Sequence, residues 1–267
     1  MPRLISRSFD NCATPASRTR IQHGCLDLSL VIPVCNEADN VDSLCAELRQ
    51  CLGSLDHEVV FVDDGSTDGT AASLARLREA MPRLRVVRHA TNAGQSAALL
   101  TGVRAARAEW VATLDGDGQN DPEDVLRLWR LARTASAPAG LYIGHRISRR
   151  DSRLRILSSW IANGVRSRLL RDRVSDTGCG IKLFRRDVFL SLPYFDHMHR
   201  FMPALVRREG LEVITYPVTH RHRLAGASKY GVRNRLWVGI VDVVGVMWLL
   251  RRRHRPGPIE EAGGHGS

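Results

Sequence analysis

The sequence lacks the cysteine patterns of a zinc site or a disulfide scaffold. Its six cysteines include no C-x-x-C pair, and none has a histidine at metal-ligand spacing. An apolar segment is also missing from residues 1–27, which begin with charged and small polar side chains, so no secretory signal is expected there. These absences favour a reducing compartment and a polar, disordered N-terminal tail.

Aromatic residues and lysines are scarce, although the chain is strongly basic. Aromatics make up 6% of the sequence, and Lys182 and Lys229 are its only lysines, so arginine carries nearly all of the formal net charge of +11. Such a charge suits nucleic acid, an acidic membrane surface or a phosphorylated substrate. Nucleic-acid-binding surfaces interleave basic with aromatic side chains and carry recognisable motifs. The sequence has neither feature, so no nucleic-acid partner is expected.

Nucleotide-binding fingerprints of the common kinds are absent as well. The first apolar run, residues 28–33, leads into Val34-Cys35-Asn36-Glu37 with no G-x-G-x-x-G and no Walker lysine. This excludes a dehydrogenase and a P-loop enzyme.

Short apolar runs alternate with longer amphipathic ones from residue 28 onward. The short runs have the length of strands, and the segments between them repeat apolar residues at helical spacing. This order predicts an α/β domain over residues 28–232, with a mostly parallel sheet and flanking helices. The expected strands are 28–33, 58–63, 85–88, 110–114, 140–147, one entered from a glycine-rich loop within 177–184, and 212–217.

Two acidic turns, Asp63–Gly65 and Asp115–Asp117, end the second and fourth predicted strands. In an open parallel sheet, ligands bind beyond the carboxyl ends of the strands, so both turns fall where a site is expected. Two carboxylates one residue apart can hold a hard divalent cation, with Gln119 adding a neutral oxygen and a nucleotide diphosphate filling the remaining positions. A calcium loop is excluded because Asn120 stands where it needs glycine. Ordinary turn formation by Asp and Gly stays open.

An arginine-rich segment follows the fifth predicted strand, between Arg146 and Arg173. Apolar residues at helical spacing up to Leu169 predict a helix inside it, with a basic opposite face. Arg166 and Arg168 are expected to meet water or anionic headgroups.

The last apolar run, Leu236–Leu250, lies within a helix predicted over residues 233–255, and residues 256–267 are expected to form a disordered tail. A helix over that run reaches roughly 22 Å, short of the about 30 Å hydrocarbon core of a bilayer. Tryptophans near its ends and arginines beyond it favour an interfacial amphipathic helix on a membrane surface. Packing of this helix on the domain core is the alternative.

Seven motifs occur in order along the chain: VIPVCNE, VFVDDGSTDGT, NAGQSAAL, LDGDGQNDPED, GHR, DTGCGIKLFRRD and HRHRLAGASKYG. Together they resemble family 2 inverting glycosyltransferases with a GT-A fold, a Rossmann-like α/β architecture. Within that family they resemble the dolichol-phosphate mannose synthases and bacterial polyprenol-phosphate glycosyltransferases. The resemblance covers about residues 28–230, and its specificity comes from the ordered series.

The resemblance implies a site for each reacting group. The nucleotide-sugar donor is expected to contact Pro33, Cys35, Glu37, Val62, Asp64, Asp115, Gly116, Asp117, Arg146, Arg223 and Lys229. Mg²⁺ or Mn²⁺ is expected on Asp117 and Gln119, with Asp115 shared with the donor. The lipid phosphate is assigned to Arg146, Arg155, Asp176 and Thr177. The residues implied in catalysis are Asp117, Arg146, Arg223 and Lys229.

The resemblance further implies transfer of a sugar, with inversion, from a GDP- or UDP-linked donor to a polyprenyl phosphate. A lipid monophosphate has a second pKa of about 6, so it is an anion at neutral pH and needs no strong general base. No Q-x-x-R-W segment is present, which disfavours a processive synthase. A non-processive enzyme acting on a polysaccharide, glycolipid or protein stays open. The expected location is peripheral, on the cytoplasmic face of the plasma membrane, and the sugar and oligomeric state are left open.

Overall fold

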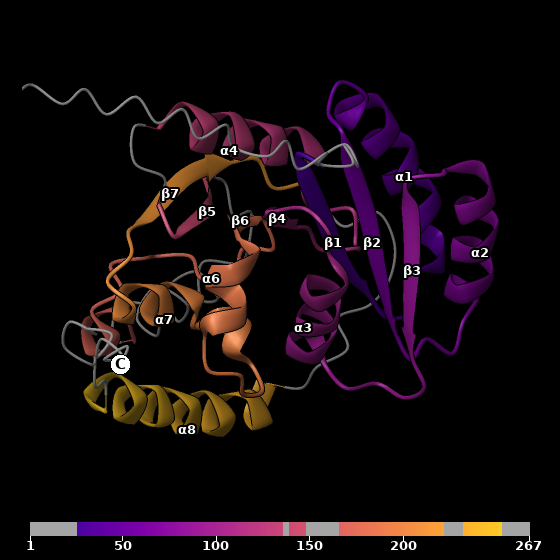
Figure 1. The fold of residues 1–267 in the computed structure, drawn as a ribbon. Helices are drawn as coiled ribbons and strands as arrows, with labels where there is room; N and C mark the ends of the chain where they lie inside the picture. Colours follow the sequence, from indigo (N-terminus) through magenta and orange to yellow (C-terminus); the bar gives the residue numbers. More distant parts are fainter. Residues whose placement is uncertain (1–25, 136–138, 148–165, 222–231, 253–267) are drawn as a thin grey trace, which may run out of the picture.

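The computed structural model describes residues 26–135, 139–147, 166–221 and 232–252 (Figure 1). A seven-stranded sheet in the order β3-β2-β1-β4-β6-β5-β7 lies at its centre. The strands are Leu28–Val34 (β1), His57–Asp64 (β2), Leu84–His89 (β3), Trp110–Thr113 (β4), Leu141–Arg146 (β5), Lys182–Arg185 (β6) and Val213–Val218 (β7). The predicted α/β class and its strands are confirmed.

The strand directions bring the expected site residues to one edge of the sheet. β1 pairs in parallel with β2 and β4, β2 with β3, and β5 with β7, whereas β6 is antiparallel to both β4 and β5. The carboxyl ends of β1, β2, β4 and β5 therefore lie at the same edge, together with the amino end of β6. Sequence pattern gave no direction for β6, because a short apolar strand reads the same either way.

Helices cover both faces of this sheet (Figure 1). β2 is buried at every position, as expected for a central strand of a sheet with two covered faces. One apolar cluster receives α1 (Ala38–Leu52), α2 (Thr70–Ala80) and α4 (Pro122–Thr134). The other receives α3 (Gln95–Ala105), α6 (Arg186–Ser191), the 3-10 turn η1 (Met198–Arg200), α7 (Met202–Arg208) and α8 (Val232–Arg251).

The start of α4 follows its sequence signal closely. Pro122 is its first residue, where its missing N–H costs no helical hydrogen bond. The side chain of Asp121 accepts a hydrogen bond from Glu123 N at 3.0 Å and caps the helix. This cap also ends the acidic turn that follows β4, so the helix fixes one side of that turn.

The predicted arginine-rich helix is described only at residues 166–170, which are helical. Leu169 is 46% exposed there and Leu170 only 4%, so the predicted apolar stripe is wrong at its last position. The predicted basic face is wrong at Arg166, whose side chain is 11% exposed. The chain that follows folds back over Arg166, and a helix-wheel pattern cannot anticipate such a return.

The last helix, α8, is apolar on two faces. Val246 is buried in the core, and Val243, Met247 and Leu250 pack against it. Two polar contacts add to this packing, because Asp242 Oδ2 lies 3.1 Å from His197 Nδ1 and Arg208 Nε donates to Leu249 O at 3.2 Å. From residue 239 onward, where its side chains are described, the exposed large apolar residues of the helix are Ile240, Val241, Val244 and Trp248. One face of α8 therefore packs on the domain core, which was the alternative interpretation. Contact of the other face with a membrane stays a prediction.

Among the residues that the structure describes, no helix combines the length and the apolar character that crossing a membrane requires.

Candidate active site

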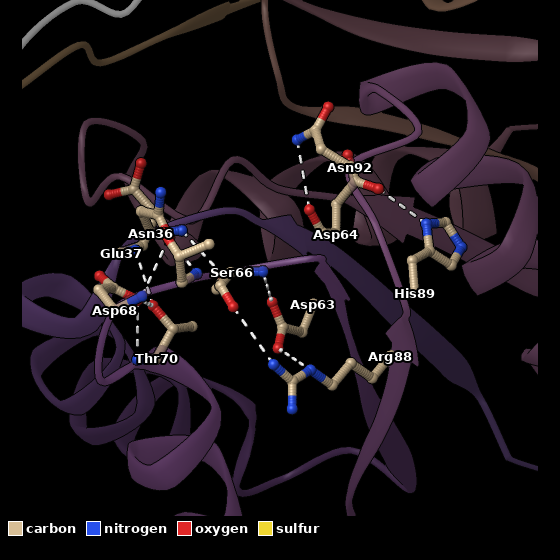
Figure 2. A network of polar contacts seen from close by, with 11 residues as sticks. Asn36, Glu37, Asp63, Asp64, Ser66, Asp68, Thr70, Arg88, His89 and Asn92 are labelled. Carbon is tan, nitrogen blue, oxygen red and sulfur yellow. Dashed lines mark hydrogen bonds and ion pairs between the residues drawn. The ribbon is translucent and has the colours of Figure 1, made fainter.

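The turns that follow β1 and β2 are joined by side-chain to backbone hydrogen bonds (Figure 2). Asn36 has a left-handed backbone with φ of 55°, and its Oδ1 accepts from the backbone N of Thr67 at 2.7 Å. Its own backbone N donates to Ser66 Oγ at 2.9 Å. Asn tolerates this conformation better than most residues, so one short side chain sets the geometry of both turns.

Asp64, at the end of β2, anchors the segment that leads into α3 (Figure 2). Its carboxylate accepts from Ala93 N and Gly94 N, each at 2.8 Å, and lies 2.7 Å from His89 Nδ1. Asp64 is almost completely buried. Its first task is therefore structural, and the expected contact with the nucleoside remains a prediction for its remaining acceptor capacity.

The other expected nucleoside residues divide into edge and core positions. Val62 is fully buried and would touch a methyl group added to Gly102 of α3, so its side chain packs in the core and is not presented to a ligand. Pro33 and Cys35 are partly buried, and Cys35 Sγ accepts a hydrogen bond from Asn92 Nδ2 at 3.3 Å. Glu37 accepts from Asn40 Nδ2 at 2.6 Å. These three lie at the site edge, and a nucleoside contact of Val62 stays a prediction that only its backbone could fulfil.

The acidic turn after β4 is held close to its neighbours on both sides. A side chain at Gly116 would overlap Val34, so only glycine lets this turn approach the end of β1. Asp117 Oδ1 accepts from Gln119 N at 3.2 Å. Asp115 Oδ1 accepts from Gln95 Nε2 at 3.0 Å, and its carboxylate lies so close to Gly180 that a Cβ there would overlap it.

Burial and like charge act together on Asp115. Burial raises the pKa of its carboxyl, and the neighbouring Asp117 raises it further, while Lys182 and Arg146 oppose the rise. Lys182 is buried at the start of β6 and donates from Nζ to Cys179 O. Burial lowers the pKa of Lys182, although Cys179 and Asp115 oppose this effect. A cation placed between Asp115 and Asp117 would relieve their repulsion.

Oxygen ligands of this kind suit Mg²⁺ or Mn²⁺ better than a soft metal. The part of the chain that the structure describes contains no group of three or more His, Cys, Asp or Glu side chains that could hold a metal ion. Asp115 and Asp117 supply two carboxylates, and Gln119 is next in the turn. The residues therefore fit a cation that takes its other ligands from a bound diphosphate and water.

Residues 172–180 precede β6 and are called the acceptor loop below because they carry the expected lipid-phosphate contacts Asp176 and Thr177; Gly180 in this loop lies against Asp115. Asp176 binds Arg146 in a bidentate ion pair, with Nε and Nη2 each 2.7 Å from a carboxylate oxygen. Burial would lower the pKa of Arg146, but its hydrogen bonds to Asp176 outweigh this and raise it. The side chains are 17% and 5% exposed, respectively. Arg146 and Asp176, which were each expected to contact the lipid phosphate, are thus paired with each other at the site.

The remaining assigned residues fall in two groups. Thr177 is buried in the acceptor loop, and its Oγ1 accepts from Arg166 Nη1 at 2.5 Å. Arg155, Arg223 and Lys229 lie outside the described residues.

The chain just before residue 222 contacts the acidic turn. Arg221 N donates to Gln119 O at 2.8 Å, and Asn120 forms an antiparallel bridge with His220. The guanidinium of Arg221 also pairs with Asp121 at 2.9 Å. The last residues described before Arg223 therefore lie at the turn that carries Asp117.

Sequence reasoning gave no role to Gln95, Lys182 or His199. Gln95 stands at the first position of α3 within the quoted NAGQSAAL motif, and that position was the available signal. Lys182 is one of two lysines and lies in an apolar strand, which is unusual for a cation. His199 is buried, with Nδ1 2.8 Å from Ser96 Oγ. Burial lowers its pKa well below 6.5, with Lys182 adding to the effect.

Comparison with known proteins agrees with this geometry. Residues 29–192 match the family model of glycosyl transferase family 2. The chain is 36% identical over 239 residues to a dodecaprenyl-phosphate galacturonate synthase of Rhizobium johnstonii, covering 87% of this chain and 70% of the relative. It is 34% identical over 212 residues to an undecaprenyl-phosphate 4-deoxy-4-formamido-L-arabinose transferase of Edwardsiella ictaluri, covering 77% of this chain and 63% of that protein.

Solved structures support the fold. Glucosyl-3-phosphoglycerate synthase of Mycobacterium tuberculosis, in complex with Mn²⁺, UDP and glucosyl-3-phosphoglycerate, aligns with a TM-score of 0.64 at 16% identity, covering 86% of this chain and 81% of that one. A mannosyltransferase of Pyrobaculum calidifontis, in complex with GDP-mannose and Mn²⁺, aligns with a TM-score of 0.59 at 20% identity, covering 88% and 66%.

The strand-end site, the ordered motifs and the match over residues 29–192 lead to one assignment. The chain belongs to glycosyl transferase family 2 and is a glycosyltransferase with a GT-A-like fold.

Proposed function

We propose that this glycosyltransferase transfers a sugar, with inversion, from a GDP- or UDP-linked donor to a polyprenyl phosphate. The observation that carries the proposal is the direct contact between its two halves: Asp115 of the acidic turn lies against Gly180 of the acceptor loop. A donor diphosphate at the first and an acceptor phosphate at the second would then be neighbours. The similarity to a dodecaprenyl-phosphate galacturonate synthase and to an undecaprenyl-phosphate 4-deoxy-4-formamido-L-arabinose transferase supports the acceptor class.

The donor side of the proposal assigns the diphosphate to the acidic turn. Mg²⁺ or Mn²⁺, when bound there, would neutralise the departing nucleoside diphosphate. Asp117 and Gln119 are the proposed ligands, and Asp115, already held by Gln95, is shared with the donor. Arg223 and Lys229 are proposed to contact the donor phosphates, since their segment starts beside Gln119.

The acceptor side must hold an anion close to another anion. The ion pair with Asp176 uses Nε and Nη2 of Arg146, which leaves the two N–H groups of Nη1 for a phosphate oxygen. Charge-assisted hydrogen bonds of this kind are strong and fix orientation. The phosphate oxygen then attacks the anomeric carbon in line with the departing diphosphate, and no second carboxylate is needed as a covalent relay. A β-linked product from an α-linked donor is the expected outcome.

A peripheral position on the cytoplasmic face of the plasma membrane completes the proposal. The exposed apolar side chains of α8 end near Arg251 and Arg252, and Arg252 lies 5.7 Å from the Trp248 ring. Apolar side chains beside arginines suit an anionic lipid surface.

The test is an assay of the purified protein with Mn²⁺, UDP- and GDP-sugars and a short-chain polyprenyl phosphate, read by mass spectrometry and NMR. A lipid-linked sugar of inverted configuration is expected. Transfer to a soluble saccharide or a protein, with none to the lipid phosphate, would establish the alternative acceptor class. A retained α configuration would overturn the single displacement.

A further inference from the structure

We propose that Arg166 is a positioning residue that holds the acceptor loop in the geometry in which Arg146 binds Asp176. This inference rests on the proposed function, because it assigns the loop to the acceptor. It differs from a role for Arg166 in lipid or solvent contact, which its place in an arginine-rich helix predicts.

The contacts of Arg166 span the loop. Nη1 donates to Thr177 Oγ1 at 2.5 Å, and Nη2 donates to Val174 O at 2.7 Å. Nη1 also lies 3.4 Å from Asp172 Oδ2 and 3.5 Å from Arg200 O. One guanidinium therefore joins the helical turn at 166–170, three points of the acceptor loop and the end of η1.

The start of the acceptor loop explains why such a clamp is needed. Arg171 and Arg173 both have φ of 54°, the left-handed region that non-glycine residues adopt at a cost of about 1 kcal/mol or more. Asp172 between them has no exposed surface, and its Oδ1 accepts from Val174 N at 3.2 Å. The Arg166 guanidinium lies 3.4 Å from this buried carboxylate, so their attraction opposes the cost of burying Asp172 between two strained residues.

The loop is held from the opposite side by β5. Asp176 pairs with Arg146, and Ser175 Oγ lies 3.1 Å from His145 Nδ1. Thr177 follows Asp176 directly, so its bond to Arg166 limits how far the Asp176 carboxylate can move. Arg166 and Arg146 thus fix neighbouring residues from two elements, and only Arg146 is placed to meet the phosphate.

Arg168 offers a matched control. It is the same residue type, two positions further along the same helical turn, but its side chain is exposed. A lipid-contact role predicts similar effects of Arg166→Met and Arg168→Met on binding to anionic vesicles. A positioning role predicts that Arg166→Met, but not Arg168→Met, impairs use of the acceptor, and that the two variants bind vesicles equally well.

The experiment compares Arg166→Met, Arg166→Lys and Arg168→Met in the full chain. We expect Arg166→Met to lower kcat/KM for the polyprenyl phosphate about 10- to 100-fold, with the donor KM and vesicle binding unchanged. Arg166→Lys should restore part of that loss, and Arg168→Met should behave as wild type. Equal effects of the two methionine variants, or loss of vesicle binding with Arg166→Met, would overturn the proposal.

Two further measurements test the proposal if Arg166→Met does not fold or if the protein does not use a polyprenyl phosphate as its acceptor. Thr177→Val removes one acceptor of Arg166, and combined with Arg166→Lys it should cost no more than the larger single change if both act through this bond. Additive losses would contradict the proposal. Amide hydrogen exchange at residues 172–180 needs no substrate: it should rise with Arg166→Lys and not with Arg168→Met. If exchange rises but no variant or wild type glycosylates the lipid, the proposed function fails and the positioning role stands. Unchanged exchange would refute the positioning role alone.

Discussion

The donor half and the acceptor half of the site are held together in different ways. Around β1 and β2, carboxylate and amide side chains bind backbone N–H groups of neighbouring turns, as Asn36 and Asp64 do. Around β5 and β6, arginine guanidiniums pair with carboxylates instead, as Arg146 does with Asp176 and Arg166 with Asp172. Asn, Asp and Gly mark the turns of the first half in the sequence, whereas no sequence signal tells which carboxylate an arginine of the second half will pair with.

The largest expected effect comes from the turn that both halves share. Asp117→Ala should lower kcat at least about 1000-fold, because its carboxylate serves the cation that stabilises the leaving group. Its melting temperature should stay near that of the wild type, since Asp117 is only partly buried. Asp39→Ala, on the exposed side of α1, is the matched control. Near wild-type activity of Asp117→Ala in excess Mn²⁺ would contradict the assignment.

Breaking the acceptor half alone is the next effect in size. Asp176→Asn leaves Arg146 without its paired carboxylate. Removing one partner of a buried ion pair lowers the free energy of unfolding by about 3–5 kcal/mol. Since Arg146 is 17% exposed, the low end of that range is expected. Steady-state kinetics should show a raised acceptor KM and an unchanged donor KM. An equal rise in both would mean that the two halves do not act separately.

Breaking the donor half should give the opposite kinetic result. Asp64→Asn weakens the hydrogen bonds to Ala93 N and Gly94 N, which position the start of α3 and Gln95. A loss of about 1–3 kcal/mol of unfolding free energy is expected, measured in urea. The donor KM should rise and the acceptor KM should not. A changed acceptor KM alone would show that α3 serves the other half.

The two faces of α8 allow a comparison outside the site. Val244 is 60% exposed and Val246 is 1% exposed. Val244→Asp should reduce co-sedimentation with anionic vesicles severalfold without changing the melting temperature, because it places a charge on the proposed lipid face. Val246→Asp should destabilise the fold instead, since it buries a charge. Unchanged vesicle binding with Val244→Asp would exclude that face as the membrane contact.

The smallest expected effect is on the pH dependence of stability. Burial, with the charge of Lys182, lowers the pKa of His199 well below 6.5. Protonation therefore favours the unfolded chain, so the contribution of His199 is complete above about pH 6.5 and declines as the pH falls below it. His199→Gln should flatten the slope between about pH 6.5 and 5 by up to about 1.4 kcal/mol per pH unit. An unchanged slope would show that His199 is protonated when folded.

The strand ends, the acidic turns and the start of α4 could be predicted because each depends on local chemistry. Asp115 and Asp117 follow a buried run, and the parallel rule places them at the ligand edge. Val62 packs in the core because both faces of β2 are covered, and the strand pattern does not tell which of its atoms a ligand would meet. Arg166 was misplaced because its contacts come from residues 172–200, which lie outside its own helical turn. The hydrophobic pattern of one helix does not tell which later residues fold back onto it.

The contact between Gly180 and Asp115 has a consequence for protein engineering. A chimera that exchanged the acceptor loop with that of a relative would also change the wall against which the donor-side carboxylate rests. Acceptor preference and donor turnover should therefore evolve together in this enzyme, and libraries that vary one substrate pocket need Gly180 kept and Asp115 monitored. We therefore expect that donor and acceptor specificity cannot be changed independently, although different parts of the chain determine them.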